Sequence, residues 1–270
     1  MMNDECGMMS KTPERVAIVG GASAGLGYAV AEELLRQGKR VVIVSRSEER
    51  ITAAAESLRE ATEGEVAPVA ADLTEPEGPA RVVTATREYF GQPEIIVTNA
   101  GGPPAMKAIN ASTDDMTAAC ELMLFPVQRF LELCLPPMRS AGWGRLVAIT
   151  SIAVREPQPM LVLSNTLRAG LTGYLKTVAD EVASNGVTVN SVLPGYTATD
   201  RLAELAEIKA EAMGTTPEAL MANWATMAPI GRLLEPAEVA AATAFLCSDA
   251  ASGITGHALP VDGGYGRGLL

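Results

Sequence analysis

The stretch Val16-Ala-Ile-Val-Gly-Gly-Ala-Ser-Ala-Gly-Leu-Gly27 decides how this sequence folds. The β-branched run at residues 16–19 indicates a buried strand, and the glycine-rich segment at residues 20–27 leads into a helical pattern. Glycine is needed where the chain turns tightly and where a diphosphate must approach bare backbone, and the following helix offers unpaired N–H groups at the positive end of its dipole. The junction of strand and helix therefore favours a nucleotide-binding turn over a purely structural one.

Short apolar runs alternate with longer amphipathic stretches along the rest of the chain. The runs predict strands at residues 16–19, 41–44, 66–70, 95–97, 146–149 and 187–192. Strands separated by helical intervals imply a parallel sheet with helices on both faces. We therefore expect an α/β fold: a single-domain Rossmann fold with a doubly wound parallel sheet over residues 15–270, preceded by a flexible tail at residues 1–14.

Composition excludes several classes of protein. The 270 residues are 48% hydrophobic and 20% charged, which is enough apolar surface for a folded core. A formal charge of −11 would repel a phosphodiester backbone, so we expect no nucleic-acid partner. The four cysteines form no CxxC pair and His257 is the only histidine, so we expect no metal. Without a signal peptide or a long apolar run, the sequence predicts a cytoplasmic protein that does not enter a membrane.

Residues 200–228 interrupt the regular alternation of strands and helices. They form an insertion between the sixth strand and the next helix, at the edge of the sheet where ligands bind. Its apolar residues fit either a substrate lid with an apolar lining or an ordinary packed pair of helices. These residues are Leu202, Leu205, Ile208, Met213, Met221, Trp224 and Met227.

Arg46 stands at the end of the second strand, where an acidic residue would bind a ribose 2′-hydroxyl. Its planar guanidinium suits a 2′-phosphate, so the sequence favours NADP(H) over NAD(H) as cofactor. The alternative is a solvated surface arginine, and Ala24 does not supply the second basic residue that is often present within the glycine turn.

From about Arg15 to Gly264 the sequence resembles the short-chain dehydrogenases/reductases, in particular the subgroup that includes the 3-oxoacyl-carrier-protein reductases. The motifs that carry the resemblance are the glycine turn, an Asp-Leu pair, Asn-Ala-Gly after the fourth strand, a Pro-Gly loop after the sixth, and a C-terminal Val-Asp-Gly-Gly. The cofactor-binding residues that the resemblance implies, beside Arg46, are Gly21, Ser23, Ala24, Gly25, Leu26, Gly27, Asp72, Leu73, Asn99, Ala100, Gly101, Arg168, Pro194, Gly195, Thr197 and Thr199.

The family works with an Asn, Ser, Tyr, Lys set, and only its serine is retained here, as Ser151. The family tyrosine lies thirteen positions after this serine and its lysine four positions later, which in this chain are Ser164 and Arg168. The family asparagine falls on Met123. A serine hydroxyl is a poorer acid than tyrosine and an arginine does not exchange a proton near neutral pH, so the usual proton relay is missing.

Two tyrosines are candidates to replace the missing acid. Tyr196 follows Pro194 and Gly195 in a loop that should border the nicotinamide, and it is either a relocated acid or a contact to the lid or to a neighbouring subunit. Tyr174 lies nearly three turns after Ser164 and is expected to be a packing residue.

Other polar residues near the predicted site leave their roles open. Arg155 and Glu156 are expected either to recognise an anionic or polar group of the substrate or to form a surface ion pair. His257 is expected to be structural.

The sequence therefore predicts an NADP-dependent oxidoreductase that moves a hydride between nicotinamide and a small carbonyl or alcohol substrate with an apolar part. Ser151, Ser164, Arg168 and Tyr196 are the predicted catalytic residues. The alternative is a nucleotide-binding non-redox enzyme, such as an isomerase or cyclase, or an inactive regulatory homologue. The family also implies a homodimer or homotetramer, formed through helices at about residues 113–139 and 162–184, with a kink at Pro126 and with interface residues Leu122, Leu124, Phe125 and Leu131.

Overall fold

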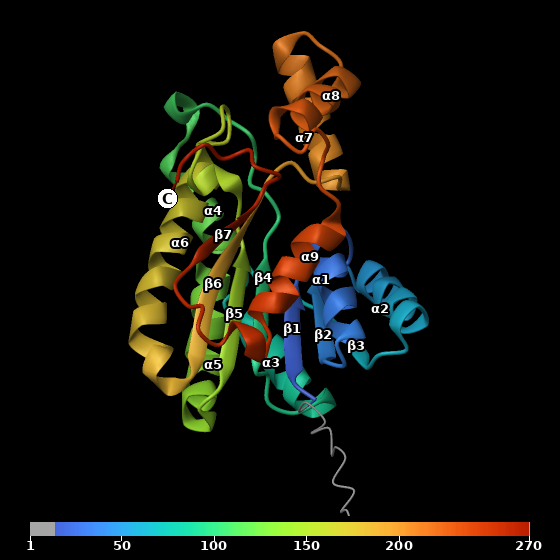
Figure 1. The fold of residues 1–270 in the computed structure, drawn as a ribbon, viewed down its shortest axis with the longest axis vertical. Coiled ribbons are helices and arrows are strands. Elements are labelled where there is room, and N and C mark those ends of the chain that lie inside the picture. Colours follow the sequence, from blue (N-terminus) through green and yellow to red (C-terminus); the bar gives the residue numbers. More distant parts are fainter. Residues whose placement is uncertain (1–13, 270) are drawn as a thin grey trace, which may run out of the picture.

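The computed structural model describes residues 14–269. A seven-stranded parallel sheet runs through the middle, in the order β3-β2-β1-β4-β5-β6-β7 (Figure 1). Its strands are β1 (Val16–Gly20), β2 (Arg40–Ser45), β3 (Val66–Ala70), β4 (Ile95–Asn99), β5 (Gly144–Ile149), β6 (Val187–Pro194) and β7 (Ala258–Val261). The predicted doubly wound fold and the six predicted strands are confirmed, and the short β7 adds a seventh.

Helices cover both faces of the sheet and bury alternate residues of each strand. Ala17 and Val19 of β1 face one core and Ile18 faces the other, because successive strand residues point to opposite sides. One face is covered by α1 (Gly25–Arg36), α2 (Glu48–Thr62) and α9 (Pro236–Leu246), and the other by α3 (Gly78–Tyr89), α5 (Phe125–Ala141) and α6 (Val162–Val182). All five residues of β1 are buried, as expected for a strand with helices on both faces.

The remaining helices lie toward the carboxyl ends of the strands. They are α4 (Thr113–Met123), α7 (Asp200–Met213) and α8 (Pro217–Met227). In Figure 1, α7 and α8 project together beyond the sheet, and they share a small core of their own around Leu202, Ala206 and Trp224. The predicted insertion at residues 200–228 is therefore a helical pair, and its role as a lid stays a prediction.

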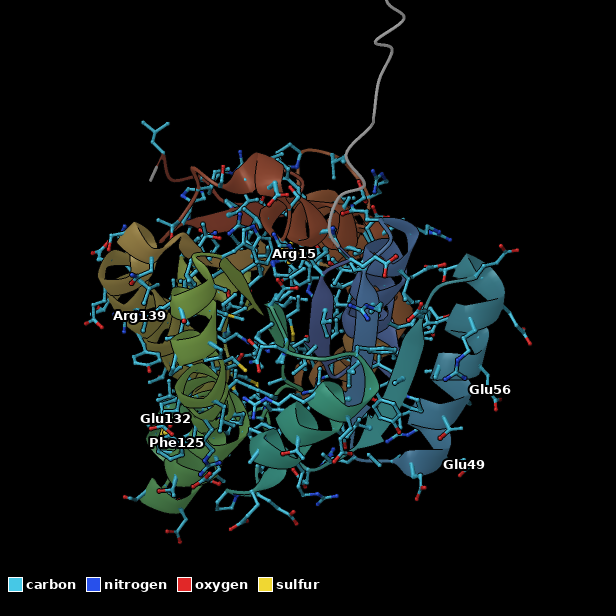
Figure 2. The ribbon with its side chains drawn as sticks, turned by 90° about the horizontal axis from the view of Figure 1, so that it is seen from below. Arg15, Glu49, Glu56, Phe125, Glu132 and Arg139 are labelled. Atoms are coloured by element: carbon cyan, nitrogen blue, oxygen red, sulfur yellow. The ribbon has the colours of Figure 1, made fainter. Side chains whose placement is uncertain are left out.

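The long helix predicted at residues 113–139 is divided into two. The break falls at Leu124, two residues before Pro126, which lies in the first turn of α5, where proline needs no N–H partner. The prediction that Leu131 lies in a subunit interface is wrong, because this residue is 3% exposed and packs in the chain's own core. Phe125 is 36% exposed on the outer side of α5, along which Figure 2 also shows Glu132 and Arg139.

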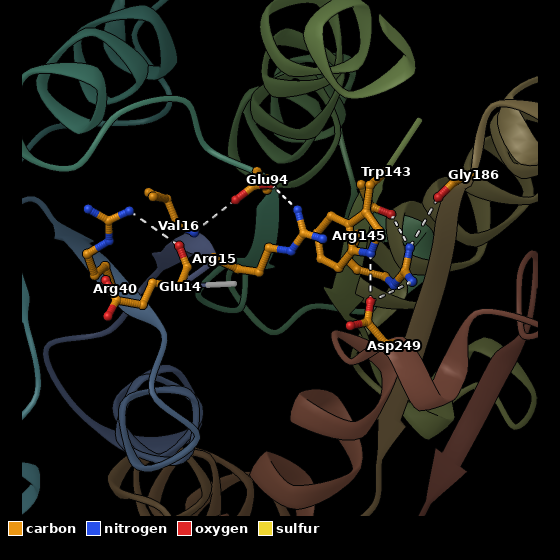
Figure 3. A network of polar contacts seen from close by, with 10 residues as sticks. Glu14, Arg15, Val16, Arg40, Glu94, Trp143, Arg145, Gly186 and Asp249 are labelled. Carbon is orange, nitrogen blue, oxygen red and sulfur yellow. Dashed lines mark hydrogen bonds and ion pairs between the residues drawn. The ribbon is translucent and has the colours of Figure 1, made fainter. Parts of the chain in front are cut away.

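A polar network closes the amino ends of the strands (Figure 3). Arg15 and Arg145 both stack on Trp143, with guanidinium carbons 3.9 and 4.3 Å from its ring centroid. Arg15 also pairs with Glu94, while the Trp143 indole donates to Asp249 at 2.7 Å. These contacts hold the amino ends of the strands together, and the ends where ligands bind in doubly wound sheets are the opposite, carboxyl ones.

Two further expectations concern the N-terminal tail and the membrane. The predicted tail at residues 1–14 lies, apart from Glu14, outside the described residues. None of the helices in residues 14–269 has the length and hydropathy that crossing a membrane requires.

Candidate active site

The turn between β1 and α1 is pressed against the end of β4. Gly21 has a φ of +60°, and a Cβ at this position would lie 2.4 Å from Asn99 O. A Cβ on Gly27 would lie 2.3 Å from Gly21 O, so the start of the helix packs directly on the turn. Helix α1 begins at Gly25 after Ala24, which has no capping side chain, so its first N–H groups are available to an anionic ligand.

A cavity of about 390 Å³ runs along this turn. Its walls are the carboxyl ends of β1, β2, β4 and β5, the segments after β3 and β4, and parts of α2, α4, α5 and α6. The chain leaves β1 toward one edge of the sheet and later resumes at β4 on its other side, which is the switch point where doubly wound sheets bind nucleotides. The predicted cofactor residues that line the cavity are Gly21, Ser23, Arg46, Asp72, Leu73, Asn99, Ala100, Gly101 and Arg168.

The other predicted cofactor residues do not line the cavity. Thr199 comes close to the glycine turn, because a Cβ on Gly25 would lie 3.7 Å from Thr199 Cγ2. Thr199 Oγ1 also accepts a hydrogen bond from Leu202 N at 3.3 Å and caps α7. The residues outside the lining are Ala24, Gly25, Leu26, Gly27, Pro194, Gly195, Thr197 and Thr199.

Basic residues gather at the end of the cavity beside β2. Arg46 and Arg50 are both exposed and both line it, and Arg50 was not anticipated from the sequence. Asp72 faces them from the segment after β3 and accepts hydrogen bonds from Thr74 N at 2.9 Å and Thr74 Oγ1 at 2.8 Å. Burial would raise the pKa of Asp72, but these hydrogen bonds and the charge of Arg46 lower it overall. The carboxylate is therefore ionised and can accept hydrogen bonds from an adenosine group.

Arg168 reaches from α6 to the opposite end of the cavity. Its Nη1 donates to Thr150 O at 2.8 Å and to Ile149 O at 3.1 Å, and its Nε donates to Ser164 Oγ at 3.1 Å. Desolvation by burial, together with the charge of Arg201, lowers the pKa of Arg168 to about 10. Arg168 therefore remains a cation at neutral pH.

The two serines differ from Arg168 in that neither lines the cavity. Ser164 Oγ accepts from Arg168, so its hydroxyl hydrogen remains free to be donated. Ser151 Oγ accepts from Ala153 N at 3.1 Å and is likewise left with its hydrogen to donate. Met123 is 2% exposed and packs with Leu163 in an apolar cluster beside them.

Tyr196 lies in an aromatic cluster under the helical pair. Its ring stacks on Trp224 of α8, with centroids 5.1 Å apart, and meets Tyr265 edge-on at 5.6 Å. Its hydroxyl donates to Gln158 Oε1 at 3.1 Å. Burial and the neighbouring Tyr265 raise the pKa of Tyr196 above its ordinary value. Tyr196 therefore contacts the α7–α8 pair, as one of its two alternatives proposed.

The remaining polar residues make backbone contacts. Arg155 Nη2 donates to Ala258 O at 3.0 Å, and Glu156 Oε1 accepts from Arg267 N at 2.9 Å. His257 donates through its backbone N to Asn190 Oδ1 at 3.0 Å, with its side chain exposed. Tyr174, expected to be a packing residue, is 36% exposed near Glu132 and lies away from the cavity lining.

Known proteins resemble this chain over nearly its whole length. The chain matches a family model described as Enoyl-(Acyl carrier protein) reductase over residues 21–266. It is 33% identical over 250 residues to 3-oxoacyl-[acyl-carrier-protein] reductase FabG of Pseudomonas aeruginosa, covering 93% of this chain and 96% of the relative. It is 34% identical over 253 residues to cis-4-hydroxycyclohexanecarboxylate dehydrogenase of Sinomonas cyclohexanicum, with the same two coverages.

Solved structures agree with these relatives. L-sorbose reductase from Gluconobacter frateurii, complexed with NADPH and L-sorbose, superposes with a TM-score of 0.88 at 32% identity and covers 94% of this chain and 97% of its own. An NADPH-bound short chain oxidoreductase from Pseudomonas aeruginosa, described as containing an atypical catalytic center, has a TM-score of 0.85 at 28% identity, with coverages of 95% and 98%.

These comparisons bear out two predictions, an oxidoreductase and NADP(H) as its cofactor, because the relatives are reductases and dehydrogenases and both structures contain NADPH. The family model spans most of the sequence, and relatives above 30% identity cover nearly all of it. The chain belongs to the short-chain dehydrogenase/reductase family.

Proposed function

We propose that this chain is an NADP(H)-dependent carbonyl reductase or alcohol dehydrogenase that works with Ser151, Ser164 and Arg168. The observation that carries the proposal is the 3.1 Å hydrogen bond from Arg168 Nε to Ser164 Oγ, with Arg168 lining the cavity that also contains the glycine turn. A cation fixed beside a hydroxyl stabilises the negative charge that develops when the hydroxyl gives up its proton.

The cavity fits a nicotinamide dinucleotide phosphate. The bare backbone of the glycine turn and the uncapped start of α1 suit a diphosphate, while Arg46 and Arg50 suit a 2′-phosphate. Asp72 accepts from the adenosine, and Arg168 retains an Nη2 group for a ribose hydroxyl beyond its contact with Ala100 O at 3.5 Å. Bound NADPH supplies a hydride for the carbonyl carbon of the substrate.

The residues of this chain handle the oxygen of the substrate. Ser151 and Ser164 donate their free hydroxyl hydrogens to the carbonyl oxygen, and the charge of Arg168 stabilises that oxygen as it becomes negative. The proton then passes from Ser164 to the substrate, and Ser164 recovers one from water. Arg168 stays charged throughout, so its part is electrostatic.

We assign Tyr196, one of the predicted catalytic residues, to the wall of the substrate region. Its hydroxyl is engaged by Gln158 and its raised pKa makes it a weak acid. The stack with Trp224 supports a role for α7 and α8 as a lid over an apolar part of the substrate.

A non-redox or purely binding function is the second candidate, and Met123 is the observation in its favour. A buried methionine takes the place of the family's asparagine and leaves an apolar wall where a polar group would hold water or substrate. Under this candidate, NADPH binds without being consumed.

The test is a titration with NADPH and NADH followed by nicotinamide fluorescence, then addition of carbonyl compounds that include 3-oxoacyl thioesters. We expect tighter binding of NADPH and its oxidation by at least one carbonyl. Ser164→Ala should abolish most of this turnover, whereas Thr177→Ala, which removes an exposed hydroxyl from the same helix, should not. Binding of NADPH with no turnover across the panel would favour the second candidate.

A further inference from the structure

Arg201 lies at the mouth of the cavity, in the first turn of α7. Its Nη2 is 3.5 Å from Gly102 O, in the segment that follows β4. A Cβ on Gly102 would lie 2.8 Å from Arg201 Nη2, so the missing side chain at this position leaves the space that the guanidinium occupies. The capping residue of the same helix, Thr199, borders Gly25 at the start of α1. Arg201 therefore stands between the glycine turn and the segment after β4.

The charges around Arg201 are unbalanced. The charge of Arg201 helps to lower the pKa of Arg168, so the two cations lie near each other, and Arg168 lines the cavity. The acid beside Arg201 is Glu204, at 3.1 Å, but both side chains are about half exposed, at 47% and 60%, and a pair of this kind contributes little. Asp72 is the acidic residue in the cavity lining, and it lies at the other end beside Arg46. An anion between Arg168 and Arg201 would relieve their repulsion.

The glycine turn itself supplies no compensating charge. It offers N–H groups and the helix dipole, and the position within the turn that could carry a basic side chain is Ala24. A diphosphate seated on the start of α1 carries two negative charges and would lie across the mouth that Arg201 spans.

We propose that Arg201 is a cofactor-binding residue: its guanidinium leaves Gly102 O and pairs with the diphosphate bridge of NADP(H). This inference rests on the proposed function. The residue supplies from α7 the positive charge that the glycine turn lacks. It also ties the α7–α8 pair to the bound cofactor. Two other roles for this arginine are a surface pair with Glu204 and recognition of an anionic group on the substrate.

The experiment compares two ligands in the wild type and in Arg201→Met. NADPH contains the diphosphate bridge, and adenosine 2′-monophosphate contains the 2′-phosphate without it. We expect Arg201→Met to raise the Kd of NADPH by about tenfold or more, the cost of one charge-assisted contact, and to leave the Ki of adenosine 2′-monophosphate within about twofold. The matched control is Arg36→Met, which removes an exposed arginine paired with Glu32 at 2.6 Å at the far end of α1 and should change neither constant.

Two results would overturn the inference. An unchanged Kd for NADPH assigns Arg201 to its pair with Glu204 or, if KM for the substrate rises instead, to the substrate. Equal weakening of both ligands shows that the variant disturbs the cavity as a whole. The proposed function is judged separately. Weakened NADPH binding in Arg201→Met supports the role of Arg201 even if no carbonyl is reduced. If the Kd of NADPH is unchanged in this variant, the role of Arg201 is refuted even if the wild type reduces carbonyls.

Discussion

Replacing Arg168 by lysine keeps the positive charge at the site but removes the planar fork that distributes it. In the structure the guanidinium donates simultaneously to Ser164 Oγ, Ile149 O and Thr150 O, at 2.8 to 3.1 Å. A lysine side chain is shorter and ends in one ammonium nitrogen. It cannot donate at once to Ser164 Oγ on its own helix and to the carbonyls of Ile149 and Thr150. Loss of the charge-assisted bond to Ser164 is worth about 1.5–3 kcal/mol, which corresponds to a fall of about 10- to 150-fold in kcat/KM.

The assay is NADPH oxidation with the best carbonyl substrate, in wild type, Arg168→Lys and the control Arg139→Lys. Arg139 is an exposed arginine of α5 that donates to Asn185, so its replacement should leave kcat/KM unchanged. The carbonyls left without donors should also lower the free energy of unfolding of Arg168→Lys by about 1–3 kcal/mol, measured with urea. If Arg168→Lys keeps kcat/KM within about threefold of wild type, the guanidinium does not activate Ser164 as described.

Further predictions concern the cofactor, the sheet and the pH dependence of stability. Arg46→Ala should raise the Kd of NADPH by about tenfold or more while changing that of NADH by less than about twofold, because the lost contact is to the 2′-phosphate; equal weakening of both would contradict the assignment. Arg145→Met should lower the free energy of unfolding in urea by about 3 kcal/mol, because this side chain, 2% exposed, donates to the carbonyls of Ser248, Gly144 and Gly186; an unchanged midpoint would refute this. Glu238 accepts from both terminal nitrogens of Arg232, and the hydrogen bonds from Arg232 and from the backbone of Glu235 lower its pKa from 4.5 to about 2. Its stabilising effect is therefore complete above pH 4.5 and is lost as the pH falls toward 2, so Glu238→Gln should be less stable than wild type at pH 6, with the difference shrinking in acid. A difference that grows as the pH falls would have the wrong sign.

The sheet and the glycine turn could be predicted from local sequence because each depends on signals within a few residues. Buried parallel strands read as short apolar runs, and the turn needs glycine at Gly21, where a positive φ and the nearby Asn99 exclude a side chain. The one-turn spacing of Ser164 and Arg168 likewise predicted that the two side chains would face the same side of α6, and they are hydrogen-bonded.

Features that depend on distant parts of the chain were missed or misread. Leu131 has the same apolar character whether it faces its own core or a neighbouring subunit, so its burial against β-strand residues could not be read from the pattern. Arg201 and Gly102 are 99 positions apart, and only the folded chain brings them together. The hydroxyl of Tyr196 is engaged by Gln158 from another loop, a contact that motif spacing does not reveal.

The central claim is tested most directly by the rate of NADPH oxidation in the presence of a carbonyl panel, with Ser164→Ala measured beside the wild type. The account predicts carbonyl-dependent oxidation that falls at least about tenfold in Ser164→Ala, with the Kd of NADPH unchanged. Oxidation that proceeds equally fast without the Ser164 hydroxyl, or NADPH that binds tightly and is never consumed, would contradict it.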